Sequence, residues 1–116
     1  MTRQAAERFG HWGERRAAWW LRLHGWRILD QRVKLRVGEI DLIARRGRTT
    51  AFIEVKARAT AAALDLAIDE YRLRRVAAAV NAVSHRYARP GDDIRIDIIL
   101  IAPRAWPRHL ANVWHG

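Results

Sequence analysis

The sequence predicts one α/β domain in which helices pack on a mixed β-sheet. Two segments, residues 4–24 and 66–86, repeat apolar side chains at the spacing of an amphipathic helix. A polar turn with one glycine, residues 45–49, separates two strand-like segments and predicts a β-hairpin. An apolar, β-branched run at residues 94–101 is typical of a strand buried on both faces. A helix between the hairpin and this strand implies a sheet with both parallel and antiparallel pairs.

The amino-terminal part supplies a helix and a short strand. The helix is expected over residues 4–24, because Gly25 stands where a C-terminal cap glycine belongs. A strand at residues 26–29 and a basic connection at residues 31–36 follow. The residues that recur at helical spacing are Phe9, Trp12, Ala17, Trp20 and Leu21.

The hairpin and the second helix form the middle of the predicted domain. The hairpin strands are expected over residues 37–44 and 50–56. The second helix is expected over residues 66–86, and Pro90 with Gly91 breaks it. The apolar stripe of this helix consists of Leu73, Val76, Val80, Val83 and Tyr87.

The chain has 116 residues, half of them apolar, which is enough for one hydrophobic core. We expect a folded domain over residues 1–102 and an irregular tail over residues 103–116. Trp106 and Trp114 in the tail are expected to dock on the domain or on a partner. An interaction protein that uses this tail is therefore one possible interpretation.

The composition argues against cysteine-based sites and against a membrane or secreted location. No cysteine is present, which excludes disulfide bonds and thiolate metal sites. No apolar run approaches the length of a membrane span, and the amino terminus lacks the apolar stretch of a signal peptide. We therefore expect a cytoplasmic protein without a membrane partner.

The formal net charge of +10 indicates a polyanionic partner. Nearly all the positive charge is arginine, since Lys34 and Lys56 are the only lysines. A guanidinium group donates two hydrogen bonds to phosphate and stacks on bases, so nucleic acid is the expected partner. The alternative is a compositional bias of the genome toward arginine and alanine, which needs no partner.

Acidic residues on the two hairpin strands are brought together by strand alternation. Glu39 and Asp41 share one face of the first strand, and Glu54 and Lys56 share one face of the second. The opposite face of the first strand is expected to carry Ile40, Leu42 and Ala44.

The turn sets how closely the two carboxylates approach. A turn at residues 47–48 places Asp41 directly opposite Glu54, and a turn at residues 46–47 makes them diagonal neighbours. Carboxylates at a Cβ separation of about 4.5–5.5 Å repel unless one is protonated or a cation lies between them. Oxygen ligands of this kind suit magnesium or manganese. Lys56 would position or help deprotonate an attacking water, or offset charge on a phosphate.

An ordinary ladder of ion pairs on a solvated face is the alternative to a metal site. Glu14 argues against it, because an acid that points toward the packed face is costly without a partner. A metal shared with the hairpin carboxylates would supply that partner, and so would a salt bridge to an arginine at the edge of the core. The helix neighbours that place Glu14 beside the packed face are Gly10, Ala17, Ala18 and Leu21.

These segments resemble the signature of the YraN family of small bacterial proteins, which are grouped with Holliday-junction-resolvase-like and restriction-endonuclease-like nucleases. Residues 38–44 read GEIDLIA and residues 52–58 read FIEVKAR. The two blocks are specific together, whereas E-x-K alone would be weak. The resemblance extends to residues 13–14, 17–18, 25–29, 74–76, 78–79 and 95–98.

The resemblance implies a restriction-endonuclease-like α-β-β-β-α-β core with a PD-(D/E)xK metal site. Asp41 and Glu54 match the metal ligands, with the Val55 carbonyl beside them, and Lys56 matches the catalytic lysine. Glu14 is similar to the first-helix acid of the junction-resolving branch. Residues 1–102 would then be the nuclease-like domain.

The chain departs from the family pattern beside these residues. It has Ala57 where the family usually has threonine, and residues 60–63 read TAAA where the family usually has Phe-Gly. Arg72 stands where a lysine is usual. Glu39 belongs to the family block, and we expect it to pair with Lys56 or to support the site.

The predicted function is a magnesium- or manganese-dependent DNA endonuclease that hydrolyses phosphodiester bonds. Branched and single-stranded DNA are the candidate substrates, and RNA and a homodimer suited to symmetric junction cleavage stay open. The alternative is a nucleic-acid-binding module that keeps the nuclease fold without turnover. The candidate phosphate contacts are Arg45, Arg46, Arg48, Arg58, Arg72, Arg74 and Arg75.

Overall fold

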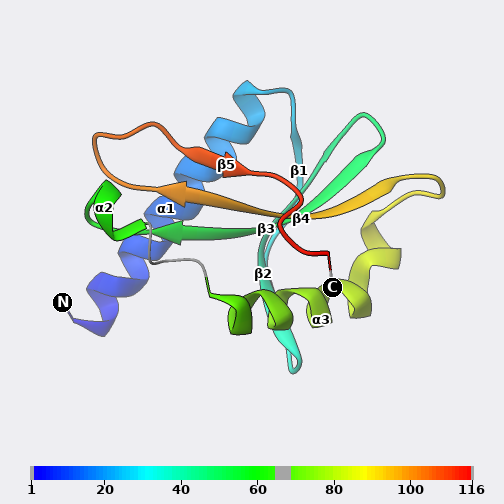
Figure 1. Ribbon diagram of the computed structural model, residues 1–116, viewed down its shortest axis with the longest axis horizontal. Helices are drawn as coiled ribbons and strands as arrows, with labels where there is room; N and C mark the ends of the chain where they lie inside the picture. The colour runs from blue at the N-terminus through cyan, green and yellow to red at the C-terminus, as the bar shows by residue number, and fades with distance from the viewer. Residues whose placement is uncertain (1, 65–68, 116) are drawn as a thin grey trace.

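A five-stranded mixed sheet flanked by helices forms the protein, and the computed structural model describes residues 2–64 and 69–115 (Figure 1). The strands lie in chain order across the sheet; β3 and β4 are parallel, and every other neighbouring pair is antiparallel. The predicted mixed α/β class is therefore confirmed. The elements are α1 (Arg3–Leu23), β1 (Arg27–Leu35), β2 (Gly38–Arg46), β3 (Thr49–Ala57), α2 (Ala61–Leu64), α3 (Glu70–Tyr87), β4 (Asp93–Ile101) and β5 (Arg108–Leu110).

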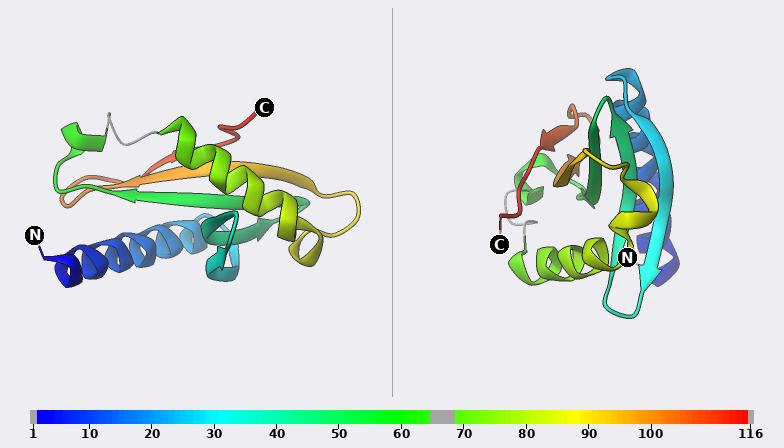
Figure 2. Two further views of the ribbon diagram at one scale, coloured as in Figure 1. Left: turned by 90° about the horizontal axis from the view of Figure 1, so that it is seen from below. Right: turned by 90° about the vertical axis from the view of Figure 1, so that its right-hand side faces the viewer.

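The two long helices cover opposite faces of the sheet (Figure 2). Alternation along the strands separates two apolar clusters, so that Ile98 packs on the α3 side and Ile99 on the α1 side. From α1 the buried residues are Gly13, Ala17, Ala18 and Leu21. From α3 they are Leu73, Val76, Ala79, Val80 and Val83.

Of the two turns considered, the hairpin of β2 and β3 has the one at residues 47–48, whose register would place Asp41 opposite Glu54 if the pairing continued that far. Arg46 pairs with Thr49, which leaves residues 47–48 as a two-residue turn. Gly47 has a φ of 60°, a left-handed conformation that favours glycine. The pairing of β2 with β3 extends only as far as Leu42 with Ile53.

Side-chain alternation in β2 shifts at Asp41, which corrects one prediction. Ile40, Leu42 and Ala44 were expected on one face. Leu42 and Ala44 pack with α1, but Ile40 packs with Ile43 against α3. The strand therefore turns about its axis at the point where it separates from β3.

Several element boundaries differ from the expectation. Residues 31–36 are not a connection, because β1 continues to Leu35 as a partner of β2. The second helix has Asp69 as its N-cap, whose side chain accepts a hydrogen bond from the Tyr71 backbone N–H at 2.9 Å. Its predicted start at residue 66 lies outside the described residues. The helix ends at Tyr87, near the predicted end at residue 86.

The carboxyl-terminal tail is irregular except for β5, which pairs with Ile98–Leu100 of β4. The fully buried Asp97 anchors this tail. Its carboxylate accepts hydrogen bonds from the Asn112 backbone N–H at 2.9 Å and from Arg95 Nη2 at 2.8 Å, and it lies 2.8 Å from His109 Nε2. These bonds and their charge hold the pKa of Asp97 below its ordinary value despite burial. Trp106 stays exposed and Trp114 is half-buried.

In the described part of the chain, neither long helix has the apolar length that a membrane crossing requires.

Candidate functional site

Asp41 lies where β2 and β3 separate. Beyond the last paired residues, the Val55 backbone N–H donates a 2.8 Å hydrogen bond to Oδ2 of Asp41. The carboxylate thus replaces a strand partner while remaining at the edge of a hollow. Burial raises the pKa of Asp41 to about 6, and the negative charges of Glu14 and Glu54 add to this increase against the Val55 hydrogen bond.

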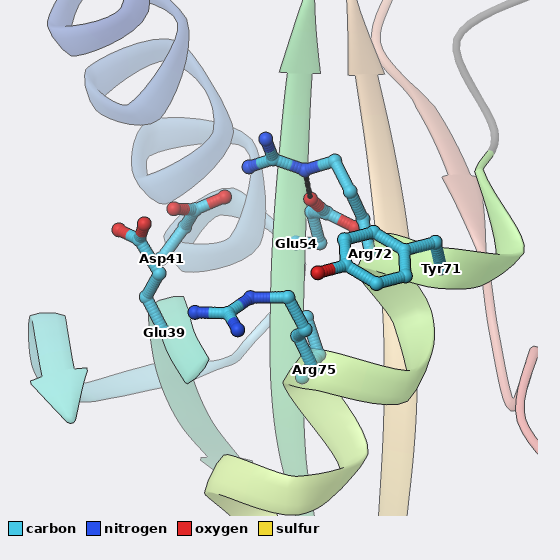
Figure 3. Close-up of a pocket in the computed structure, with 7 residues that line it drawn as sticks. Glu39, Asp41, Glu54, Tyr71, Arg72 and Arg75 are labelled. Carbon is cyan, nitrogen blue, oxygen red and sulfur yellow. Dashed lines mark hydrogen bonds and ion pairs between the residues drawn. The ribbon is translucent and has the colours of Figure 1, made fainter. Parts of the chain in front are cut away.

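Glu54 lies on β3 among cationic groups. Its side chain is 4% exposed, and its Oε1 accepts a 3.0 Å hydrogen bond from Arg72 Nε of α3 (Figure 3). The Lys56 ammonium lies 3.1 Å from the same oxygen. Two positive charges therefore balance a carboxylate that would be costly to bury alone.

Lys56 is buried, with 8% of its side chain exposed. It shares a face of β3 with Glu54 and lines a second hollow, to which Phe9 of α1 and Arg58 also contribute. Of the two roles expected for Glu39, the pair with Lys56 is not the one observed, because Lys56 pairs with Glu54, and a supporting role stays a prediction. Glu39 is exposed beside Asp41 at the mouth of the first hollow (Figure 3).

Glu14 points from α1 into a hollow that it shares with Glu39 and Asp41. Its side chain is 12% exposed, and its Oε2 lies 3.4 Å from Arg32 Nε. The salt bridge to an arginine, one of the two partners considered for this acid, is therefore present. Arg32 has a φ of 51°, an uncommon value for a residue with a side chain, and it lies between the β1 residues that pair with Leu42 and Ile40 of β2.

The four acids approach one another without forming a closed metal site. In residues 2–64 and 69–115, no group of three or more Asp, Glu, His or Cys side chains is placed to hold a metal ion as it stands. Asp41 nevertheless experiences the charge of both Glu14 and Glu54. The site is a set of carboxylates separated by arginine and lysine groups.

Three of the predicted phosphate contacts surround this site. Arg72 and Arg75 extend from α3 toward the acids of β2 and β3, and Figure 3 shows the Arg75 guanidinium directed at Glu39 and Asp41. Arg58 lines the hollow that contains Lys56 and donates a 2.8 Å hydrogen bond to the Ala57 carbonyl.

The other predicted phosphate contacts lie away from the acids. Arg45 forms a part-buried ion pair with Asp92, and Arg46 lies over the Trp26 ring at 4.6 Å. Arg48 is exposed in the hairpin turn, at the opposite end of β3 from Lys56. Arg74 pairs with Glu70 along the exposed face of α3 at 3.4 Å.

Two features of the site were not predicted. Tyr71 lines the first hollow, and nothing but its place beside Arg72 at the start of α3 indicated this. Gly38 is the second, because a Cβ atom there would lie 2.0 Å from the Arg75 carbonyl oxygen. The glycine of the GEIDLIA block therefore lets α3 cross β2 closely enough to bring its arginines to the acids.

The model of the uncharacterised protein family UPF0102 matches residues 13–101 of the chain. The chain belongs to this family. UPF0102 is the YraN family, so the resemblance noted from the GEIDLIA and FIEVKAR blocks is confirmed at the level of the family. The match includes every acid of the site and ends before the tail.

Several UPF0102 proteins are similar to the chain over almost its whole length. The protein of Sphingopyxis alaskensis is 69% identical over 114 residues, covering 98% of each chain. That of Rhizorhabdus wittichii is 65% identical over 98% of this chain and 97% of its own. That of Erythrobacter litoralis is 64% identical over 98% of each.

Proposed function

We propose that the protein is a metal-dependent endonuclease that hydrolyses phosphodiester bonds of DNA, with a restriction-endonuclease-like fold and a PD-(D/E)xK site. One observation carries the proposal: Asp41 and Glu54 line one hollow near the point where β2 and β3 separate, and Glu54 pairs with the buried Lys56. Arg72 and Arg75 line the same hollow. A buried lysine paired with a buried acid has no evident use in a solvated ladder of ion pairs.

The donor groups fit a hard divalent cation in kind. Asp41 and Glu54, with the Val55 carbonyl and Glu14, offer the oxygen ligands that magnesium and manganese prefer. Burial is the main cause of the raised pKa of Asp41, and the charges of Glu14 and Glu54 add to it, so a nearby cation would favour the charged carboxylate. Glu54 and Glu14 would have to release Arg72 and Arg32 to join Asp41 as ligands. A bound cation would supply Lewis-acid activation of water and phosphate.

The side chains of the site have distinct roles in this proposal. The Lys56 ammonium, held by Glu54, would orient the attacking water or stabilise negative charge that develops on the phosphate. Arg72 and Arg75 would bind non-bridging phosphate oxygens at the mouth of the hollow. Arg72 would transfer from Glu54 to the phosphate as the substrate binds.

The alternative is a nucleic-acid-binding module that keeps this fold without turnover. The charge balance of Glu54, which already has two cationic partners, favours this alternative. Ala57 and residues 60–63, which depart from the family pattern, add to it.

A cleavage assay separates the two proposals. Branched, single-stranded and duplex DNA are incubated with magnesium or manganese and wild type, Asp41→Ala or Lys56→Ala. Asp93→Ala, which removes an exposed acid at the start of β4, is the matched control. The endonuclease predicts that wild type and Asp93→Ala cut while the two site variants lose about 100-fold or more in rate and still bind. Binding without cutting by wild type would support the module.

A further inference from the structure

We propose that the outer face of α1, together with the loop between β4 and β5, binds single-stranded nucleic acid by stacking unpaired bases on Trp19 and Trp106. This surface, called the Trp/Arg surface below, lies apart from the acids of the candidate site. It is formed by Trp12, Arg15, Arg16, Trp19, Arg104 and Trp106.

The first half of the Trp/Arg surface is a stripe along α1. Trp12, Arg15, Arg16 and Trp19 follow helical spacing and together line one hollow. Arg15, Arg16 and Trp19 are exposed on the side of α1 away from its buried positions, whereas Trp12 is partly buried against the core on the α1 side of the sheet. Trp19 is 49% exposed, although burial of a tryptophan is strongly favourable.

The second half comes from the loop after β4. Arg104, Ala105 and Trp106 line another hollow, to which Arg16 also contributes, so Arg16 borders both hollows. Trp106 is 76% exposed. Its ring centroid lies 6.4 Å from that of Trp20, so the Trp106 indole lies beside α1 and still remains exposed.

The chemistry of this surface fits nucleic acid with accessible bases. Exposed indoles provide flat apolar platforms for bases, and the arginines among them supply positive charge for the phosphates. The Arg16 guanidinium already lies over the Trp12 ring at 5.3 Å, an arrangement in which the indole and the charge act together. No acidic residue lines either hollow within the described part of the chain. A duplex would present phosphates but not base faces, so a single strand is the expected ligand.

The Trp/Arg surface is connected to the candidate site. Phe9 stacks on Trp12 with 5.2 Å between ring centroids, and Phe9 also lines the hollow that contains Lys56. A single strand on the surface would therefore have a short path to that hollow. The binding proposal does not depend on cleavage and can be tested without it.

The test measures binding of short oligothymidylate, oligouridylate and a matched duplex in EDTA by fluorescence anisotropy. Wild type is compared with Trp19→Ala, Trp106→Ala and Arg16→Ala. Each tryptophan substitution should weaken single-strand binding by about tenfold and leave duplex binding unchanged. Both tryptophans are exposed, and an unchanged melting temperature confirms that the variants fold.

Arg86→Ala is the matched control for charge, because Arg86 is exposed on α3, on the opposite face of the sheet. It should weaken single-strand binding less than Arg16→Ala does. Equal losses for the two arginine variants, equal losses for single strand and duplex, or binding of anionic vesicles without oligothymidylate would each overturn the proposal. Binding is measured in EDTA, which prevents metal-dependent cleavage, so failure to cleave DNA would leave this result unaffected.

Discussion

Asp41 combines a structural contact with a charge that the fold does not fully balance. The Val55 N–H points toward β2 beyond the end of the strand pairing, and the Asp41 carboxylate satisfies it. An asparagine side chain offers an oxygen for the same hydrogen bond without the charge. Comparing aspartate with asparagine at position 41 therefore separates the contribution of the hydrogen bond from the electrostatic cost of the charge.

The Asp41→Asn variant should change how stability depends on pH in metal-free buffer. The folded pKa of about 6 lies above the ordinary value of 3.8, so the stabilising effect of the protonated carboxyl is complete below about pH 4. It is lost as the pH rises through about 6. The variant should therefore gain free energy of unfolding relative to wild type between pH 4 and 7, measured by urea denaturation. Asp93→Asn serves as the control, and parallel curves for Asp41→Asn and wild type would contradict the prediction.

Arg72 forms an ion pair with Glu54, a carboxylate that a divalent cation would need as a ligand. Arg72→Ala should therefore increase the rise in melting temperature caused by magnesium, because Glu54 loses a competing partner. The same variant should bind DNA more weakly, since an arginine at the mouth of the hollow is removed. Arg74→Ala, whose partner Glu70 is outside the site, is the control. If Arg72→Ala decreases the magnesium effect, Arg72 supports the ligands rather than competing with them.

At the scale of elements, Gly38 determines how closely α3 crosses β2. Gly38→Ala should lower the free energy of unfolding by about 1–3 kcal/mol, because the new Cβ meets the Arg75 backbone rather than a movable side chain. Gly10→Ala is the matched control, since nothing lies within 4 Å of its added Cβ. In the interior of α1, that substitution should stabilise the protein by about 0.5–1 kcal/mol. Chemical denaturation measures both, and equal effects would show that Gly38 is not a packing constraint.

Elements with strong local signals were predictable from the sequence. The hairpin turn followed from Gly47 among polar residues, and β4 followed from its β-branched apolar run. The continuation of β1 through residues 31–35 did not, because Val33 and Leu35 alternate with charged residues over too short a stretch to stand out from a basic connection. The short β5 depends on contacts with β4 that no local pattern records.

The candidate site was predictable in its acids and lysine but not in their partners. Residues on neighbouring strands follow from hairpin register, so the proximity of Asp41 and Glu54 could be inferred. The ion pairs of Glu54 with Arg72 and of Glu14 with Arg32 join different elements. Their formation depends on where α3 and β1 lie against the hairpin, which spacing along the chain does not determine.

At the scale of the whole molecule, the two faces of the sheet carry different surfaces. The arginines of α3 approach the acids on one side, and the Trp/Arg surface covers the outside of α1 on the other. The net charge of +10 indicated the partner class but not this division. The two surfaces are separate because α1 and α3 pack on opposite faces of one sheet.

The β5 strand shields the last exposed row of backbone groups on β4. Removal of residues 103–116 would uncover the apolar Ile98–Leu100 segment and deprive Asp97 of two partners. The truncated chain should self-associate, with an apparent mass in size-exclusion chromatography that grows with protein concentration. A truncated chain that stays monomeric at every concentration would count against this role. A peptide that copies the lost segment should then restore the monomer. An affinity tag that replaces residues 103–116 should cause the same self-association as the truncation.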